Sequence, residues 1–187
     1  PALAERIVGE AVKRFPTEPR VALLHASQLR KAGNGDEARK VLSSLESTPL
    51  LAPELRLAIA QQYDGLGDAA QAAATLARGP QDNQTYGLRA SLLAKAEDNT
   101  TLGLLYDELR KDASNPDPDR RLLLGQLAEL LERYEDARGW YANVPGDGVQ
   151  GIARLRGASV LHAMGRKDES FAALRALQND DEVEGEV

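Results

Sequence analysis

One pattern recurs five times along the 187-residue chain and limits what it can fold into. Each copy holds an apolar helical stretch, a Gly or polar turn, a small residue opening a second helix, and a Leu or Tyr four residues later. The position of the small residue falls at Ala38, Ala72, Leu102, Ala137 and Ser170, with spacings of 34, 30, 35 and 33 residues. A period of this size indicates stacked two-helix units rather than a single globular core.

The composition favours an all-α fold. The chain contains 29 Ala and 29 Leu, but only 3 Ile and 9 Val. Ala and Leu stabilise helices, whereas β-branched residues are typical of strands, so an all-β or parallel α/β fold is not expected. Pro19, Pro53 and Pro118 each stand where a helix is expected to begin, which is where proline is tolerated best.

The period and pattern resemble the tetratricopeptide repeat, a 34-residue helix–turn–helix unit, over nearly the whole chain. The resemblance implies a right-handed solenoid of about five and a half repeats. In that family the first helix of each repeat, helix A, carries a small residue where it packs on helix B. The matching positions are Ala26, Ala60, Ala90, Gly125 and Ala158.

Two features depart from the family pattern. Gly ends helix A at Gly33, Gly67 and Gly165, but Glu97 and Glu132 replace it in repeats three and four. In repeat three, Leu102 also occupies the small-residue position of helix B, and we expect a shortened turn there. In the larger apolar position that follows, the repeats have Leu42, Leu76, Tyr106, Tyr141 and Leu174.

The pattern also predicts where the elements lie. We expect helices over 3–14, 19–32, 36–47, 53–66, 69–78, 83–96, 99–113, 119–132, 135–142, 149–164 and 168–177. These form a tetratricopeptide solenoid over 1–178, with a half repeat at 1–16 and repeats at 19–50, 53–80, 83–115, 118–147 and 150–178.

The net charge of −6 describes mainly the end of the chain. Asp180, Asp181, Glu182, Glu184 and Glu186 lie in the last eight residues, and removing these five of the 29 acids leaves 24 against 23 basic residues. We therefore expect a nearly neutral folded body and an acidic disordered tail over 179–187. A nucleic-acid reader would need a basic groove, so nucleic acid is not an expected partner.

The chain lacks the residues that several classes of site require. It has no Cys, which excludes disulfides and thiol nucleophiles. No apolar run is long enough to cross a membrane, and the charged N-terminal stretch is not a signal peptide. Gly146, Gly148 and Gly151 match G-x-G-x-x-G, but they follow a predicted helix rather than the strand that dinucleotide binding requires. We interpret them as a flexible loop between repeats.

No set of residues predicts catalysis. His25 and His162 fall in different repeats, and neither has convergent partners at helical spacing. Trp140 precedes Tyr141, which takes the core position of the same helix, so packing between helices is the expected role of Trp140 rather than stacking on a ligand. We therefore expect no catalytic residues, no metal and no cofactor, and the chain is not predicted to be an enzyme.

The candidate partner-binding residues come from the family resemblance. Helix A lines the concave face of tetratricopeptide solenoids, and that face receives an extended peptide or a partner helix. Carried onto this chain, the lining positions are Leu23, Ser27, Arg30, Leu57, Gln61, Asp64, Gly87, Ser91, Ala94, Leu122, Gln126, Glu129, Leu155, Ser159 and His162.

These residues predict the kind of partner. Chaperone-type members hold a chain-terminal carboxylate with Lys and Asn at the first two positions of each set, which here are Leu or Gly followed by Ser or Gln. A carboxylate-clamp ligand is therefore not expected. A Leu strip beside short hydrogen-bonding side chains suits an apolar or amphipathic protein segment. The alternative is that these leucines only pack between helices.

Two functions of different classes follow. The first is a non-catalytic protein-binding scaffold or adaptor that holds a peptide or partner helix on its concave face. The second is a structural homo-oligomerisation module of a larger tetratricopeptide protein, built on the unpaired N-terminal helix edge. A pentatricopeptide-like RNA reader has a similar period, but the uncharged groove disfavours it.

Residues 119–178 are also similar to the C-terminal repeats of proteobacterial tetratricopeptide lipoproteins of the cell envelope. The segments that carry this resemblance are LLLGQLAELLERYEDARGWYANVPGDG and ARLRGASVLHAMGRKDESFAAL. Members of that group are outer-membrane-tethered adaptors that bring a periplasmic protease to its substrates. The resemblance implies a periplasmic adaptor fragment whose anchoring Cys and leader lie upstream of Pro1, with a cytoplasmic location as the alternative.

Overall fold

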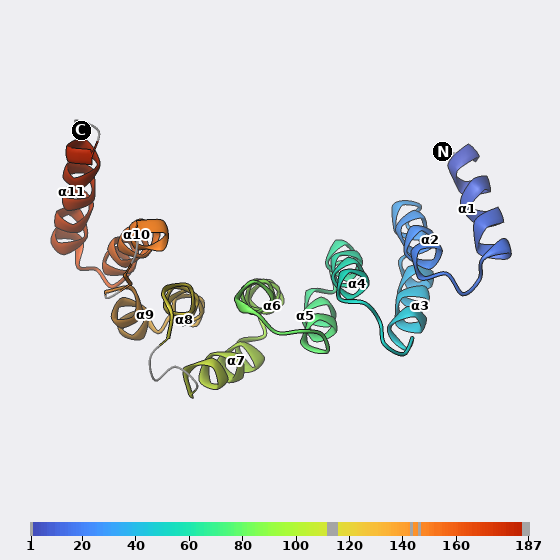
Figure 1. The fold of residues 1–187 in the computed structure, drawn as a ribbon, viewed down its shortest axis with the longest axis horizontal. Helices are drawn as coiled ribbons and strands as arrows, with labels where there is room; N and C mark the ends of the chain where they lie inside the picture. The colour runs from blue at the N-terminus through green and yellow to red at the C-terminus, as the bar shows by residue number, and fades with distance from the viewer. Residues whose placement is uncertain (1, 112–115, 143, 146, 185–187) are drawn as a thin grey trace. The chain divides into compact units, whose positions relative to one another are not determined.

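The computed structural model describes residues 2–111, 116–142, 144–145 and 147–184. Within these residues the secondary structure is entirely helical, so the predicted all-α class is confirmed. The helices are α1 (Ala2–Arg14), α2 (Pro19–Lys31), α3 (Gly35–Glu46), α4 (Pro53–Gly65), α5 (Ala69–Ala77), α6 (Asn83–Lys95), α7 (Asn99–Lys111), α8 (Pro118–Leu130), α9 (Tyr134–Tyr141), α10 (Asp147–Ala163) and α11 (Lys167–Glu184). Figure 1 shows their succession along the chain.

The helices divide into two compact units, Pro1–Asp98 and Asn99–Val187. In the first unit α2 packs on α3, and α4 packs on both α2 and α5. In the second unit α8 packs on α9, while α10 contacts α8, α9 and α11. The division falls between α6 and α7, inside the predicted repeat 83–115.

In each predicted repeat a three-residue turn joins the two helices, and these turns share the same backbone geometry. Its last residue donates a backbone hydrogen bond to the carbonyl five residues earlier, as from Asn34 to Leu29 (2.9 Å) and from Arg133 to Ala128 (2.8 Å). This is the Schellman arrangement, whose middle residue has a left-handed backbone. Ala96–Asp98 forms the same turn, so the shortened turn expected in repeat three is wrong. The short spacing of 30 residues between Ala72 and Leu102 coincides instead with the short helix α5, which has nine residues.

Two glutamates occupy this left-handed position. Gly33, Gly67 and Gly165 have φ of 82°, 84° and 78°, while Glu97 and Glu132 have φ of 56° and 57°. The left-handed region brings the Cβ of an L-residue close to the backbone at a cost of about 1–2 kcal/mol, which Gly does not incur. The same turn therefore forms even where glutamate replaces the glycine.

We therefore expect Glu132→Gly to stabilise the second unit by about 0.5–1 kcal/mol, because relief of the left-handed strain outweighs the greater freedom of Gly in the unfolded chain. Urea unfolding followed by the fluorescence of Trp140, the only Trp in the chain, would measure it. Gly165→Ala, at the same position of the next turn, should have the opposite sign. An unfolding midpoint for Glu132→Gly at or below wild type would contradict the strain argument.

The positions predicted to allow close helix approach are buried. Ala26, Ala38, Ala60 and Ala72 are each at most 2% exposed, and Leu102 is fully buried in α7. Gly125 of α8 faces the ring of Tyr141 of α9, where a built Cβ would lie 2.6 Å from Cδ1 and 2.8 Å from Cζ. Glycine at this position therefore lets α8 and the Tyr141 ring approach more closely than any side chain would allow.

The larger apolar positions are also buried, with one exception. Leu42, Leu76, Tyr106 and Tyr141 are at most 5% exposed, but Leu174 of α11 is 38% exposed. With 38% of its surface exposed, Leu174 is only partly covered by the described chain. The expectation that Leu174 fills a core position is therefore wrong for this chain.

Two expected irregular segments are helical. The helix α10 begins at Asp147, so Gly148 and Gly151 lie in its first turns rather than in a loop, while Gly146 lies outside the described residues. The helix α11 continues through Glu184, where disorder was expected from residue 179. The sequence between 168 and 184 contains neither Gly nor Pro to end a helix, which accounts for the extension. Residues 185–187 lie outside the described chain.

Candidate interaction surface

In the first unit, the predicted partner-binding residues lie on α2, α4 and α6, and none of them is fully buried. Leu57, Gln61 and Ser91 are exposed, with Leu57 at 39%. The half-buried residues of the set are Leu23, Ser27, Arg30, Asp64, Gly87 and Ala94. Exposure of Leu57 favours a role in binding, whereas the partial burial of Leu23 fits the packing alternative better.

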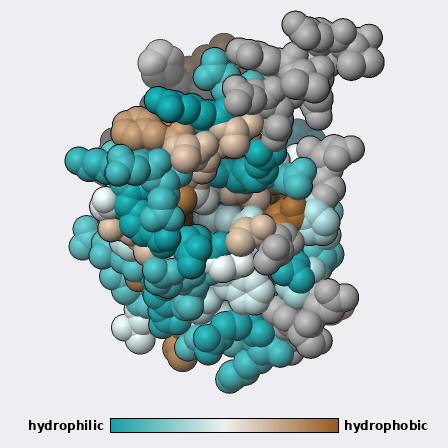
Figure 2. All heavy atoms as spheres, turned by 90° about the vertical axis from the view of Figure 1, so that its left-hand side faces the viewer, coloured by the Kyte–Doolittle hydropathy of each residue, from teal (hydrophilic) through white to brown (hydrophobic). Residues whose placement is uncertain are grey.

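In the second unit, the predicted residues lie on α8 and α10. Leu155, Ser159 and His162 on α10 are exposed, with Leu155 at 53%. Leu122, Gln126 and Glu129 on α8 are half-buried. The molecular face drawn in Figure 2 is mostly hydrophilic and carries smaller, separate hydrophobic patches.

A cavity of about 380 Å³ lies between α4, the end of α5 and the start of α6. Leu57, Leu76 and Leu88 give it apolar walls, while the Gln61, Gln84 and Thr85 side chains supply donors and acceptors. Leu57 and Leu88, each 39% exposed, leave apolar surface available to a ligand. Two of its lining residues, Leu57 and Gln61, belong to the predicted partner-binding set. The residues that α6 and the α5–α6 loop contribute were not singled out from the sequence.

Three charged residues of the predicted partner-binding set, Arg30, Asp64 and Glu129, form side-chain contacts with other helices. Arg30 of α2 donates from Nε to Gln62 of α4 (3.3 Å), and its guanidinium lies against Gly65. Lys95 Nζ of α6 lies 2.6 Å from the Asp64 carboxylate of α4.

In the second unit, Glu129 of α8 accepts hydrogen bonds from the Tyr141 hydroxyl (2.8 Å) and from Arg156 of α10 (3.2 Å). Arg30, Asp64 and Glu129 thus already have partners between neighbouring helices. The members of the predicted set that lack such contacts are mainly Leu, Ser and Gln residues.

Sequence reasoning missed a buried polar cluster in the first unit, at the end of α3. The Glu46 carboxylate at the end of α3, only 6% exposed, accepts hydrogen bonds from Thr75 Oγ1 (2.5 Å), Gln71 Nε2 (3.2 Å) and Tyr63 OH (3.3 Å). Arg78 lies 3.7 Å away. The cluster joins α3, α4 and α5, and burial of the carboxylate gives it a structural role rather than access to a substrate.

Burial raises the pKa of Tyr63 to about 12, and the nearby Glu46 carboxylate further disfavours the phenolate. Between pH 10 and about 12 the folded chain therefore keeps a proton that the unfolded chain loses. We expect the free energy of unfolding to fall as pH rises through this window, by at most about 1.4 kcal/mol per pH unit from this residue.

Urea titrations at stepped alkaline pH, followed by circular dichroism, would measure that slope. Tyr63→Phe should remove part of it, and a slope remains because burial also raises the pKa of Tyr106 and Tyr141. An unchanged slope in Tyr63→Phe would contradict the assignment.

Other candidate residues have structural contacts. Trp140 Nε1 donates a hydrogen bond to the Tyr106 hydroxyl (3.0 Å), and the Arg133 guanidinium lies 5.1 Å from the Tyr106 ring centroid. This agrees with the packing role predicted for Trp140. His25 lies in the first unit and His162 in the second. No cluster of three or more His, Asp or Glu suited to a metal occurs in the described part of the chain.

The comparisons with known proteins do not identify a relative. No protein-family model matches the chain, and no curated protein matches it. Among the described residues, no helix is both long and apolar enough to span a membrane.

Proposed function

We propose that this chain is a tetratricopeptide-type repeat protein and acts as a non-catalytic scaffold that holds a segment of a partner protein. The 34-residue pattern, the repeated Schellman turns and the buried small residues at matched positions support the repeat assignment. The observation that carries the binding function is the cavity between α4 and α6, where exposed Leu57 and Leu88 lie beside Gln61 and Gln84.

The chemistry of the cavity favours an apolar or amphipathic peptide. Transfer of apolar ligand side chains onto Leu57, Leu76 and Leu88 contributes about 25 cal/mol per Å² of buried apolar area. The side-chain amides of Gln61 and Gln84 can each donate to and accept from a peptide backbone, which satisfies polar groups that binding removes from water. Lys95 is already bonded to Asp64, which leaves it poorly suited to clamp a terminal carboxylate.

The similarity of residues 119–178 to envelope lipoprotein repeats extends the proposal to cellular context. We place the chain in a bacterial envelope complex, where it would act as an adaptor between a partner protein and its target. The segments that carry this resemblance lie in the second unit, whereas the binding cavity lies in the first.

Peptides selected from a displayed library of amphipathic segments would test the binding site. We expect Leu57→Glu to weaken a selected peptide by about tenfold or more, since tenfold corresponds to about 1.4 kcal/mol, less than a buried Leu contributes. Fluorescence polarisation would measure the affinity. Leu104→Glu is the matched control, because Leu104 is 66% exposed on α7 and does not line the cavity. Equal affinity for wild type and Leu57→Glu would overturn the assignment of this cavity.

A further inference from the structure

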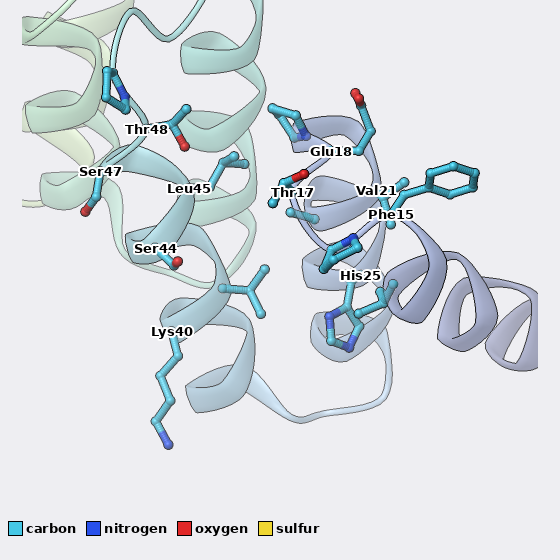
Figure 3. Close-up of a pocket in the computed structure, with 16 residues that line it drawn as sticks. Phe15, Thr17, Glu18, Val21, His25, Lys40, Ser44, Leu45, Ser47 and Thr48 are labelled. Carbon is cyan, nitrogen blue, oxygen red and sulfur yellow. The ribbon is translucent and has the colours of Figure 1, made fainter.

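The cavity between α4 and α6 differs from a larger cavity of the first unit in how its basic residue is held. The larger cavity, of about 730 Å³, is bounded by α1, α2 and α3. Its Lys40 is exposed, and Figure 3 shows the Lys40 side chain extending away from Ser44 and His25. The α4–α6 cavity has Arg56 in its lining, and Arg56 is half-buried. A half-buried charge in the wall restricts which ligands the α4–α6 cavity can accept.

The Arg56 side chain lies directly against Gly79 in the α5–α6 loop. A Cβ built on Gly79 would be 2.8 Å from Arg56 Cδ and 3.4 Å from Arg56 Nε. Gly79 also lines the cavity, so this contact forms part of the cavity wall. The backbone of Gly79 is not left-handed, so alanine is compatible with the turn but would displace the arginine. Glycine at this position therefore allows Arg56 to lie along the wall.

Arg56 has no hydrogen bond or ion pair with any other residue that the structure describes. It is also the only basic residue among the described residues that line the cavity, where Glu54 and Asp82 are the acidic ones. Glu54 is two residues from Arg56 on the same helix, and residues at that spacing do not face each other. A guanidinium carries five N–H donors in a fixed planar arrangement. The donors of Arg56 are therefore available to a ligand in the cavity.

The two acidic lining residues lie at helix N-termini, which stabilise negative charge. Asp82 precedes α6 and accepts a hydrogen bond from the Thr85 backbone N–H (2.7 Å), which lowers the pKa of the Asp82 carboxyl. Glu54 lies in the first turn of α4 and is exposed. The positive end of α4 stabilises Glu54 but does not stabilise the charge of Arg56. An anionic group of a ligand would supply Arg56 with the partner that the chain itself does not provide.

We propose that the segment bound between α4 and α6 carries an Asp or Glu side chain that pairs with the Arg56 guanidinium. An apolar residue of the same segment lies on Leu57 and Leu88. The planar guanidinium can donate two parallel N–H bonds to one carboxylate. A side chain is the source of the carboxylate, because the clamp positions for a chain terminus hold Leu57 and Gln61 here. The pairing rests on the proposed peptide-binding function and defines the chemistry of the partner.

Selection from a displayed peptide library would test the pairing. Each segment is flanked by linkers on both sides, so that it offers no free chain terminus. The wild-type chain should enrich Asp or Glu over Asn or Gln at one position beside an apolar residue, and Arg56→Gln should lose that enrichment. Arg20→Gln is the matched control, because Arg20 is an exposed arginine of α2 that does not line the cavity. Equal enrichment by wild type and Arg56→Gln would overturn the proposal.

Fluorescence polarisation with one selected peptide, blocked at both ends, would measure the preference. The wild-type chain should bind the acidic form about tenfold more tightly than the form with the corresponding amide, and tenfold corresponds to about 1.4 kcal/mol. In Arg56→Gln the preference should reverse, because Glu54 and Asp82 are the charges that remain in the lining. Arg56→Lys should keep only part of the preference, because it retains the charge without the planar donors. Equal affinity of the wild-type chain for both forms contradicts the pairing.

Two further variants separate this pairing from the peptide-binding function itself. Gly79→Ala should reduce the acid preference at least threefold by displacing Arg56, and an unchanged preference would show that the contact with Gly79 does not position Arg56. Leu57→Ala should weaken the acidic and amide forms equally, because it removes apolar contact only. If no segment is selected, or if Leu57→Ala binds like wild type, the proposed function fails. If binding depends on Leu57 but not on the ligand carboxylate, only the pairing with Arg56 fails.

Discussion

Gly125→Ala is expected to destabilise the second unit by about 2–3 kcal/mol, although alanine is the better helix former by about 1 kcal/mol. The added Cβ would lie 2.8 Å from Tyr141 Cζ and closer still to the ring edge. The Tyr141 ring cannot easily withdraw, because its hydroxyl is held by Glu129 at 2.8 Å and the residue is 3% exposed. Urea unfolding monitored by Trp140, which lies next to Tyr141 in the sequence, would report the loss.

Two controls isolate the contact with Tyr141. Gly139→Ala lies in α9 of the same unit and has nothing within 4 Å of its built Cβ, so it should be neutral or stabilising by up to about 1 kcal/mol. In a Tyr141→Leu background, Gly125→Ala should cost less than about 1 kcal/mol, because the smaller side chain relieves the overlap. If the penalty persists in that background, close approach to Tyr141 is not its cause.

Glu46→Ala is expected to lower the stability of the first unit by about 3 kcal/mol. Removing the carboxylate takes the acceptor from Tyr63 and Gln71 and one acceptor from Thr75, and it leaves a gap among α3, α4 and α5. Hydrogen bonds to a charged group contribute about 1.5–3 kcal/mol each when measured singly, but those sharing one carboxylate are not additive. Hydrogen exchange resolved to α3–α5, together with urea unfolding by circular dichroism, would measure the effect.

Glu46→Gln keeps one carbonyl acceptor and should lose roughly half as much. Ser43→Ala, at an exposed position of the same helix, should stay within about 0.5 kcal/mol of wild type. A loss below about 1 kcal/mol for Glu46→Ala would mean that the cluster is solvated and does not hold the three helices together.

Most helices could be predicted from the sequence because their signals are local. Pro19, Pro53 and Pro118 begin helices in the structure where the sequence placed them. The turns are also local, since each is closed by a bond spanning five residues, such as Asn34 to Leu29. Prediction failed at the turn of repeat three, where Leu102 in the small-residue position suggested a shortened turn. The turn forms there nevertheless, with Glu97 in the left-handed region and the Asp98 N–H bonded to the Leu93 carbonyl.

The candidate site was predictable only in part. The sequence placed Leu57 and Gln61 on one helix face, and both line the cavity between α4 and α6. It could not show that Arg30, Asp64 and Glu129 are bonded to residues 32, 31 and 27 positions away, on the next helix but one. It also gave no sign of a cavity of about 730 Å³ bounded by α1, α2 and α3, because a cavity depends on how closely these helices approach one another.

The sequence by itself determined the helical class, the register of the helices and the positions of the close approaches. These depend on helix propensity, turn residues and a repeating period, all of which can be read from neighbouring residues. The tertiary structure alone distinguished Glu46 from the exposed Glu37 of the same helix, because burial of Glu46 depends on Tyr63, Gln71 and Thr75, 17 to 29 residues away. The environment of such a side chain is set by helices that are distant in the sequence. A local sequence pattern therefore cannot predict it.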